Sequence, residues 1–290
     1  MCQGINGKKM NQCHCFVEGY KVSVPIFHGQ PPPPNSKEYS EFWHYESGKA
    51  DEGVRQQFGN GPDRWLHVLR QHEPHSQPAI NFLLRDIFAS RFVRGRVLDC
   101  GAGTCWLSAS ISCLPQVEEI TAFDLSPQFL SSVGLELFLH CGGDPNKLKF
   151  ATGTFNRLPF EDNQFDCVFL FAVVHHSLAP ISLLRESLRT LKPGGAVFVV
   201  ESPVAVWKLE TARSHSLKIS NVVTEIALTY GDLMYYFRMA GADNIIPLPL
   251  DHVTRTRGRL WARRLLRRSR LENLLRPPSY VFVLMKNHAP

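Results

Sequence analysis

The sequence lacks a long apolar run. Its best stretch, residues 165–174, is interrupted by Asp166, whereas a membrane-spanning helix needs about 20 apolar residues. Lys8 and Lys9 are not followed by a continuous apolar stretch, so the three-part pattern of a secretory signal is missing. These absences predict a chain that does not cross a membrane and that stays in the cytoplasm.

Cysteine pairs at diagnostic spacing are also missing. The eight cysteines contain no CxxC pair, so we expect reduced thiols rather than a disulfide framework. Cys13, His14 and Cys15 form a cluster of metal-ligating residue types, but alternate residues fit the usual zinc spacing poorly. The sequence therefore predicts no metal site.

An excess of charge of one sign is missing from most of the chain. The net charge is +6, but residues 251–290 hold ten Lys or Arg against two Asp or Glu, so the preceding residues are close to neutral. A near-neutral body with no dedicated RNA-binding module argues against nucleic acid as a partner. The basic excess therefore describes one segment and not the whole protein.

That basic segment is residues 254–276, where nine arginines and one glutamate are interleaved with leucines at helical spacing. A helix with an apolar stripe edged by arginines is compatible with an anionic lipid surface, which would make the protein peripheral to a membrane, or with a phosphorylated substrate. A solvated basic helix that packs through its leucines is the alternative. The sequence leaves both interpretations open.

The chain divides into three parts. Residues 1–36 lack periodicity and end in four prolines, which favours a flexible arm. Residues 37–92 carry apolar residues at helical spacing, broken by glycines and prolines, which predicts a helical cap. Residues 93–290 are expected to form the core domain, with the basic helix as an insertion.

Within residues 93–290, short apolar runs alternate with helical stretches. Alternation of this kind predicts βαβ units and therefore an α/β fold with a Rossmann-like, doubly wound, mostly parallel sheet. Seven strands are expected, the last of them antiparallel at the edge. The predicted strands are 96–100, 119–124, 147–151, 166–171, 196–201, 243–249 and 280–285, and the predicted helices are 104–113, 127–140, 180–191 and 225–240.

A glycine turn follows the first predicted strand. Gly101 and Gly103 remove side chains where a cofactor must approach backbone N–H groups at a helix start. Trp106 stands where a dinucleotide fingerprint needs a third glycine, and no Gly-Lys-Ser/Thr follows. The turn therefore argues against an NAD-type site and against a P-loop.

A carboxylate ends the second predicted strand. In an open α/β sheet, ligands bind outside the carboxyl ends of the strands, and Asp124 is placed there. Its carboxylate can accept hydrogen bonds from both hydroxyls of a ribose. The two strand ends together favour a ligand that has a ribose but no pyrophosphate.

Four motifs in this order resemble the class I S-adenosylmethionine-dependent methyltransferases, in particular the broad group that includes the ubiquinone/menaquinone-biosynthesis methyltransferases. The resemblance covers residues 93–203 and implies that S-adenosylmethionine is the cofactor. The motifs are Val-Leu-Asp-Cys-Gly-Ala-Gly-Thr at 97–104, Asp124, Leu-Pro-Phe-Glu-Asp-Asn-Gln-Phe-Asp at 158–166, and Leu-Lys-Pro-Gly-Gly at 191–195.

The resemblance also implies roles for single residues. Asp99 and the glycine turn would face the methionine portion of the cofactor, and Asp124 would bind the ribose hydroxyls. The chain departs from the family at Cys105, where a third glycine is frequent, and at residues 154–155, where the family commonly has Asp before a small residue. The residues assigned to the cofactor are Asp99, Gly101, Ala102, Gly103, Asp124, Leu125, Thr154 and Phe155.

A sulfonium methyl group is a strong electrophile, so the protein must mainly place an acceptor in line and exclude water. A hydroxyl acceptor would benefit from a general base, and His176, which follows His175 near the end of the fourth strand, is the candidate. We predict methyl transfer to a small-molecule acceptor, lipid-like or glycan-linked. RNA methylation and a non-catalytic, regulatory cofactor-binding protein are the alternatives.

Aromatic residues offer candidate walls for the acceptor pocket. They occur at residues 42–45, where three aromatics surround His44, and at Tyr235 and Tyr236. Packing in the core accounts for each of them equally well.

Overall fold

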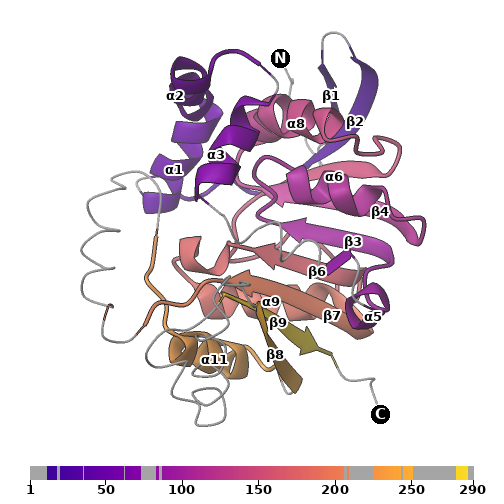
Figure 1. Cartoon of the computed structure of the whole chain (residues 1–290), viewed down its shortest axis with the longest axis vertical. Coiled ribbons are helices and arrows are strands. Elements are labelled where there is room, and N and C mark those ends of the chain that lie inside the picture. The colour runs from indigo at the N-terminus through magenta and orange to yellow at the C-terminus, as the bar shows by residue number, and fades with distance from the viewer. Residues whose placement is uncertain are drawn as a thin grey trace, which may run out of the picture.

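The computed structural model describes residues 12–17, 20–34, 36–61, 63–72, 83–84, 87–205, 208, 225–242, 244–250 and 279–286. Their centre is one nine-stranded sheet in the order β1-β2-β5-β4-β3-β6-β7-β9-β8 (Figure 1). The strands are β1 (Gln12–Val17), β2 (Tyr20–His28), β3 (Gly95–Cys100), β4 (Val117–Asp124), β5 (Leu148–Thr152), β6 (Phe165–Phe171), β7 (Leu191–Glu201), β8 (Asn244–Leu250) and β9 (Ser279–Met285).

The expected doubly wound, mostly parallel architecture is confirmed. Strands β5, β4, β3, β6 and β7 pair in parallel, and β9 runs antiparallel between β7 and β8. Because β3 pairs with β4 on one side and β6 on the other, the winding reverses direction at β3. The carboxyl ends of β3 and its neighbours are therefore where a ligand site is expected.

Within the expected flexible arm, residues 12–17 and 20–28 form the two strands of a β-hairpin. Strand β1 pairs antiparallel with β2, and β2 pairs in parallel with β5, so that His28 lies opposite Thr152. The hairpin supplies the two strands beyond the seven predicted from the sequence. It forms because the β5 edge offers backbone hydrogen-bonding groups to it, a non-local pairing that the local sequence pattern does not reveal.

Helices cover both faces of the sheet and create two apolar cores. One core joins the sheet to α5, α6 and α8, and the other joins it to α9 and α11. The central strands are apolar on both faces, as is typical of parallel strands buried on both sides. The helices and helical turns described after residue 84 are α5 (Ile87–Ser90), α6 (Trp106–Ser112), α7 (Pro127–Phe129), the π-helical turn η1 (Leu130–Gly134), α8 (Leu135–His140), the 3-10 turn η2 (Val174–His176), α9 (Pro180–Thr190) and α11 (Tyr230–Met239).

The start of α11 differs from the expected residue 225. Thr229 accepts a hydrogen bond from the backbone N–H of Asp232, and Asp232 in turn accepts one from the backbone N–H of Thr229. This capping box satisfies N–H groups that the first turn of a helix leaves free. The helix therefore begins at Tyr230.

Three helices of the predicted cap cluster on the side of the sheet that carries α8 (Figure 1). The Arg64 side chain, only 1% exposed, donates hydrogen bonds at 2.8 Å to Asp51 of α2 and to Glu136 of α8. Glu46 accepts hydrogen bonds from the Ser126 hydroxyl and the Gln128 backbone N–H. These polar contacts hold the cap on the core. The cap helices are α1 (Lys37–Glu46), α2 (Lys49–Phe58) and α3 (Arg64–His72).

The predicted basic helix at residues 254–276 lies outside the described residues. Among the helices that are described, none is long and apolar enough to span a bilayer.

Candidate functional site

The glycine turn after β3 is folded as its sequence predicts. Gly101 has φ +84°, and a Cβ placed on it would lie 2.4 Å from a methyl carbon of Val173, so only glycine fits there. Gly103 has φ +51°, and a Cβ on it would meet nothing within 4 Å. The backbone at Gly103 therefore borders open space.

Cys105 occupies the position where the resembling family frequently has a third glycine, and it adopts the backbone conformation that glycine favours. It is buried and adopts a left-handed backbone with φ +57° immediately before α6. A non-glycine residue pays about 1–2 kcal/mol for this conformation. The turn thus keeps the geometry that glycine would give, at the cost of local strain.

Asp124 closes the turn from the neighbouring strand. Its two carboxylate oxygens each accept one backbone hydrogen bond at 2.7 Å, from Gly103 and from Leu125. Burial raises the pKa of Asp124, although these two hydrogen bonds act to lower it. A carboxylate has lone pairs for further donors, so Asp124 can still accept hydrogen bonds from a ligand.

Asp99 lies apart from the other predicted site residues. It is buried behind the turn, where it accepts a 2.6 Å hydrogen bond from the Ser108 hydroxyl of α6, and it does not line the cavity. Burial raises the pKa of Asp99 to about 7, and the nearby charge of Asp124 adds to the effect. Asp99 therefore supports the turn from within the core.

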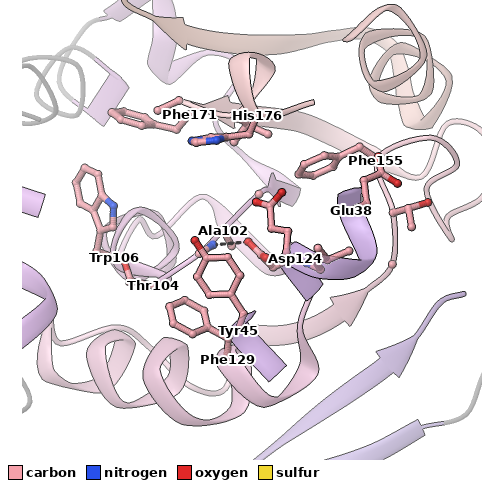
Figure 2. A pocket seen from close by; sticks show the side chains of 18 of the residues that line it. Glu38, Tyr45, Ala102, Thr104, Trp106, Asp124, Phe129, Phe155, Phe171 and His176 are labelled. Carbon is pink, nitrogen blue, oxygen red and sulfur yellow. Dashed lines mark hydrogen bonds between the residues drawn. The ribbon is translucent and has the colours of Figure 1, made fainter. Parts of the chain in front are cut away.

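The remaining predicted cofactor residues surround one cavity of about 350 Å³, a volume at the lower end of the range for small-molecule sites. Figure 2 shows Asp124 between two opposite ends of it, with Trp106 and Thr104 at one end and Phe155 at the other. The predicted residues that line the cavity are Gly101, Ala102, Gly103, Asp124, Leu125, Thr154, Phe155 and His176.

The two histidines after β6 have different surroundings. His176 lines the cavity across from Tyr45 and Phe129 (Figure 2). His175 instead contacts Glu201 of β7, with 2.9 Å between Nδ1 and Oε2, and its ring centroid lies 4.1 Å from that of His176.

Glu201 is the buried carboxylate behind this pair. It also accepts a 2.8 Å hydrogen bond from the backbone N–H of Val174. Burial acts to raise the pKa of Glu201, but the contacts with His175 and the charge of His176 outweigh it and leave the pKa lowered. Glu201 thus fixes the backbone and the ring next to the cavity-lining histidine.

The cap contributes a wall of which the sequence predicted only Tyr45. Glu38, Glu41 and Tyr45 of α1 line the cavity, because residues three and seven positions apart share one face of a helix. This spacing could have indicated from the sequence that the three residues share a face, but it does not belong to a recognised binding motif. Trp65 and Val68 of α3 complete this wall.

The other aromatic candidates lie outside the cavity. Trp43 and Tyr235 are 48% and 55% exposed, and neither they nor Tyr236 line it. Of the predicted aromatic walls, Tyr45 is the one that the cavity contains. Its ring packs against Phe129 at a centroid distance of 4.9 Å.

Comparison with known proteins shows that this chain is similar to methyltransferases. Residues 98–199 match the family described as methyltransferase domain. The ubiquinone/menaquinone biosynthesis C-methyltransferase UbiE of Pseudomonas paraeruginosa (strain DSM 24068 / PA7) is 34% identical over 152 residues, which are 50% of this chain and 58% of that protein. The match to UbiE of Pseudomonas putida (strain ATCC 700007 / DSM 6899 / JCM 31910 / BCRC 17059 / LMG 24140 / F1) spans 41% of that relative, so the chain covers about half the length of these curated relatives.

Two solved structures share the fold. A putative O-methyltransferase from Nostoc punctiforme PCC 73102 is 17% identical, with a TM-score of 0.55, over 89% of this chain and 76% of that one. PigF with SAH is 19% identical, with a TM-score of 0.53, over 86% of this chain and 70% of that one. At these identities the similarity concerns the fold alone.

Proposed function

We propose that this protein transfers a methyl group from S-adenosylmethionine to a small-molecule acceptor, because residues 98–199 match the methyltransferase domain family. The single observation that carries the proposal is the meeting of the Gly103 backbone and the Asp124 carboxylate at one cavity. The acceptor binds in the same cavity, under the wall formed by α1 and α3.

The residues present fit the cofactor from end to end. The Asp124 carboxylate takes the ribose hydroxyls, and the open backbone at Gly103 receives the methionine portion. Leu125 and Phe155 offer apolar surfaces to a planar base. Phe155 is held by packing on the buried ring of Phe123, with centroids 6.2 Å apart.

In the proposed mechanism, S-adenosylmethionine supplies an electrophilic methyl group on a sulfonium sulfur, and the protein positions the acceptor relative to that methyl group. The aromatic rings of Tyr45, Trp65 and Trp106 line the cavity and exclude water from it. Exclusion of water and in-line placement of the acceptor lower the barrier without a covalent intermediate on the protein.

His176 is the proposed general base if the acceptor is a hydroxyl. It lines the cavity, and His175 and Glu201 hold the backbone and ring beside it. His176→Ala is then expected to lower turnover by about 10²–10⁴, the usual contribution of a general base, while the affinity for S-adenosylhomocysteine stays unchanged. A smaller loss would remove His176 from that role and favour an amine, carbon or thiol acceptor.

Calorimetric titration tests the cofactor assignment. S-adenosylmethionine and S-adenosylhomocysteine are each expected to bind at a 1:1 ratio, and Asp124→Ala should weaken binding by about 1.5–3 kcal/mol, the range for hydrogen bonds to a charged group. Glu52→Ala, at an exposed position of α2, is the control and should bind as the unaltered protein does. Equal affinities of the Asp124 variant and the control would contradict the assignment.

An anionic partner is a separate proposal that rests on residues 254–276 alone. The lining residues of the cavity that the structure describes include neither Lys nor Arg, so these residues offer no basic partner to a phosphorylated acceptor. Replacement of Arg263, Arg264, Arg267 and Arg268 by glutamine should abolish sedimentation with anionic vesicles at low salt, because each basic residue near such a surface contributes about 1 kcal/mol. Failure of the unaltered protein to sediment with these vesicles would exclude the lipid surface.

A further inference from the structure

The proposed cofactor site does not account for Glu38, in the first turn of α1. Its side chain lines the cavity and is half-buried, and burial raises the pKa of its carboxyl group. Among the described residues it has no hydrogen-bond or ion-pair partner. A carboxylate withdrawn from water in this way gains most from a ligand that donates a hydrogen bond to it.

Glu38 lies at the Phe155 end of the cavity. Figure 2 shows Glu38 and Phe155 on the side of Asp124 that faces away from Trp106 and Thr104. The Phe155 end is where the proposed function places the adenine, because the ribose is fixed at Asp124 and the methionine portion points to the glycine turn.

Backbone contacts explain why α1 begins there. Gly29, which directly follows β2, donates a 2.7 Å hydrogen bond to the carbonyl of Thr152 at the end of β5. The four prolines then lead the chain to Ser36, whose hydroxyl caps α1 by accepting from the backbone N–H of Tyr39. The hairpin therefore anchors the start of α1 next to the residues that follow β5.

Among the described residues that line the adenine end, those that follow β5 contribute no acidic side chain. Residues 153–155, which follow β5 and line the cavity, are Gly, Thr and Phe. Leu125 and Phe155 can flank the base, but neither can accept a hydrogen bond through its side chain. The exocyclic amine of adenine carries two N–H donors, and a carboxylate is a strong acceptor for them.

We propose that Glu38 accepts a hydrogen bond from the exocyclic amine of the adenine, so that the cap, and not the sheet, supplies the acidic contact to the base. This inference rests on the proposed function. The other end of α1 is tied to the core beyond the strand end at Asp124, since Glu46 accepts hydrogen bonds from the Ser126 hydroxyl and the Gln128 backbone N–H.

A double-mutant cycle between protein and ligand tests the contact. S-adenosylhomocysteine and its analogue with purine in place of adenine, which lacks only the amine, are titrated into the unaltered protein and into Glu38→Ala and Glu38→Gln. Glu38→Ala should weaken S-adenosylhomocysteine about tenfold or more and the analogue less than twofold, because a lost hydrogen bond to a charged group has effects of this size. The affinity of Glu38→Gln for S-adenosylhomocysteine should lie between those of the unaltered protein and Glu38→Ala, because glutamine keeps one acceptor oxygen.

The matched control is Glu41→Ala, which removes a carboxylate one helical turn further along the same wall of the cavity. It should change the affinities for the two ligands by the same factor. Selective loss of S-adenosylhomocysteine binding in Glu41→Ala would assign the amine to Glu41 and overturn the proposal. Thermal unfolding of each variant checks that α1 is still docked.

The remaining outcomes separate this inference from the proposed function. If Glu38→Ala weakens both ligands equally or neither, while Asp124→Ala still weakens S-adenosylhomocysteine, the Glu38 contact is overturned and the cofactor site stands. If the unaltered protein binds neither ligand, the proposed function fails and the Glu38 contact fails with it.

Discussion

The core and the cap surround the same cavity but are held in place by different forces. The last four residues of β3 are buried, as are most residues of β6 and β7. In contrast, α1 and α2 of the cap contain no fully buried residue. The core is therefore stabilised mainly by apolar packing, whereas the cap combines polar contacts, such as those of Arg64 and Glu46, with the packing of Tyr45 on Phe129.

The difference between core and cap suggests separate roles for the two regions in binding the cofactor and the acceptor. The groups assigned to the ribose and methionine lie on strand ends whose positions are fixed by the sheet. Tyr45 and Trp65, which face another part of the cavity, lie on α1 and α3, outside the sheet. Specificity for the acceptor is thus expected to reside in the cap, and cofactor binding mainly in the core.

The largest expected effect comes from breaking the buried cation that joins the two regions. Arg64→Met leaves Asp51 and Glu136 without the guanidinium that bridges them, and loss of one partner of a buried ion pair costs about 3–5 kcal/mol. We expect amide hydrogens of α1, α2 and α3 to exchange faster, while those of β3 and β4 stay protected. Hydrogen exchange measured by mass spectrometry gives the exchange rates of the cap helices and of the core strands in one experiment.

Arg55→Met is the matched control for Arg64. Arg55 also contacts Asp51, at 2.7 Å, but its side chain is 43% exposed, and exposed ion pairs contribute about 1 kcal/mol or less. Equal destabilisation by the two substitutions, or loss of protection in β3 and β4 together with the cap, would show that the cap and the core are not distinct in the way described.

A smaller effect is expected inside the core at Asp99. Its native pKa of about 7 exceeds the ordinary value of about 3.9, so the native state binds more protons than the unfolded state between these values. Stability is therefore lost as the pH rises through this window. Asp99→Asn escapes this loss, and relative to the unaltered protein it should gain about 2 kcal/mol or more between about pH 4 and pH 8.

Thermal unfolding of both proteins at several pH values measures this gain. A stability difference that does not change with pH would mean that Asp99 is not desolvated in the folded protein. Titration with S-adenosylhomocysteine adds a second readout, since a residue that supports the turn from behind should change the affinity less than Asp124→Ala does.

The smallest effect is expected at the polar contact between α1 and the core. Glu46→Gln removes the charge that accepts hydrogen bonds from Ser126 and Gln128, which should cost about 1 kcal/mol. The change should appear as faster amide exchange in α1 and leave the exchange of β6 and β7 unaltered. Unchanged exchange in α1 would mean that Glu46 does not hold the cap.

The sequence predicts the core far better than the cap. Strand β6 is mostly apolar, Gly101 and Gly103 come directly after β3, and Asp124 is the last residue of β4, so the local pattern suffices. His176 was likewise predicted from its place in the segment after β6, and it lines the cavity.

The sequence does not predict features that depend on residues far apart in the chain. The β1-β2 hairpin forms against β5, more than a hundred residues later, and nothing in residues 12–28 alone specifies that edge. Glu38 reaches the cavity only because the hairpin and the Ser36 cap aim α1 toward it. The strand-end pattern also does not show that the Asp99 carboxylate accepts a hydrogen bond from Ser108 behind the turn, and its assignment to the cofactor stays a prediction.

The most direct test of the central claim is a crystal structure of the protein with S-adenosylhomocysteine. We predict the ribose hydroxyls within hydrogen-bond distance of Asp124, the homocysteine portion along Gly101–Gly103, the adenine between Leu125 and Phe155, and the sulfur facing the part of the cavity that His176 and Tyr45 line. A ligand bound elsewhere on the protein, or one whose ribose lies away from Asp124, would contradict the claim that this cavity is the site of methyl transfer.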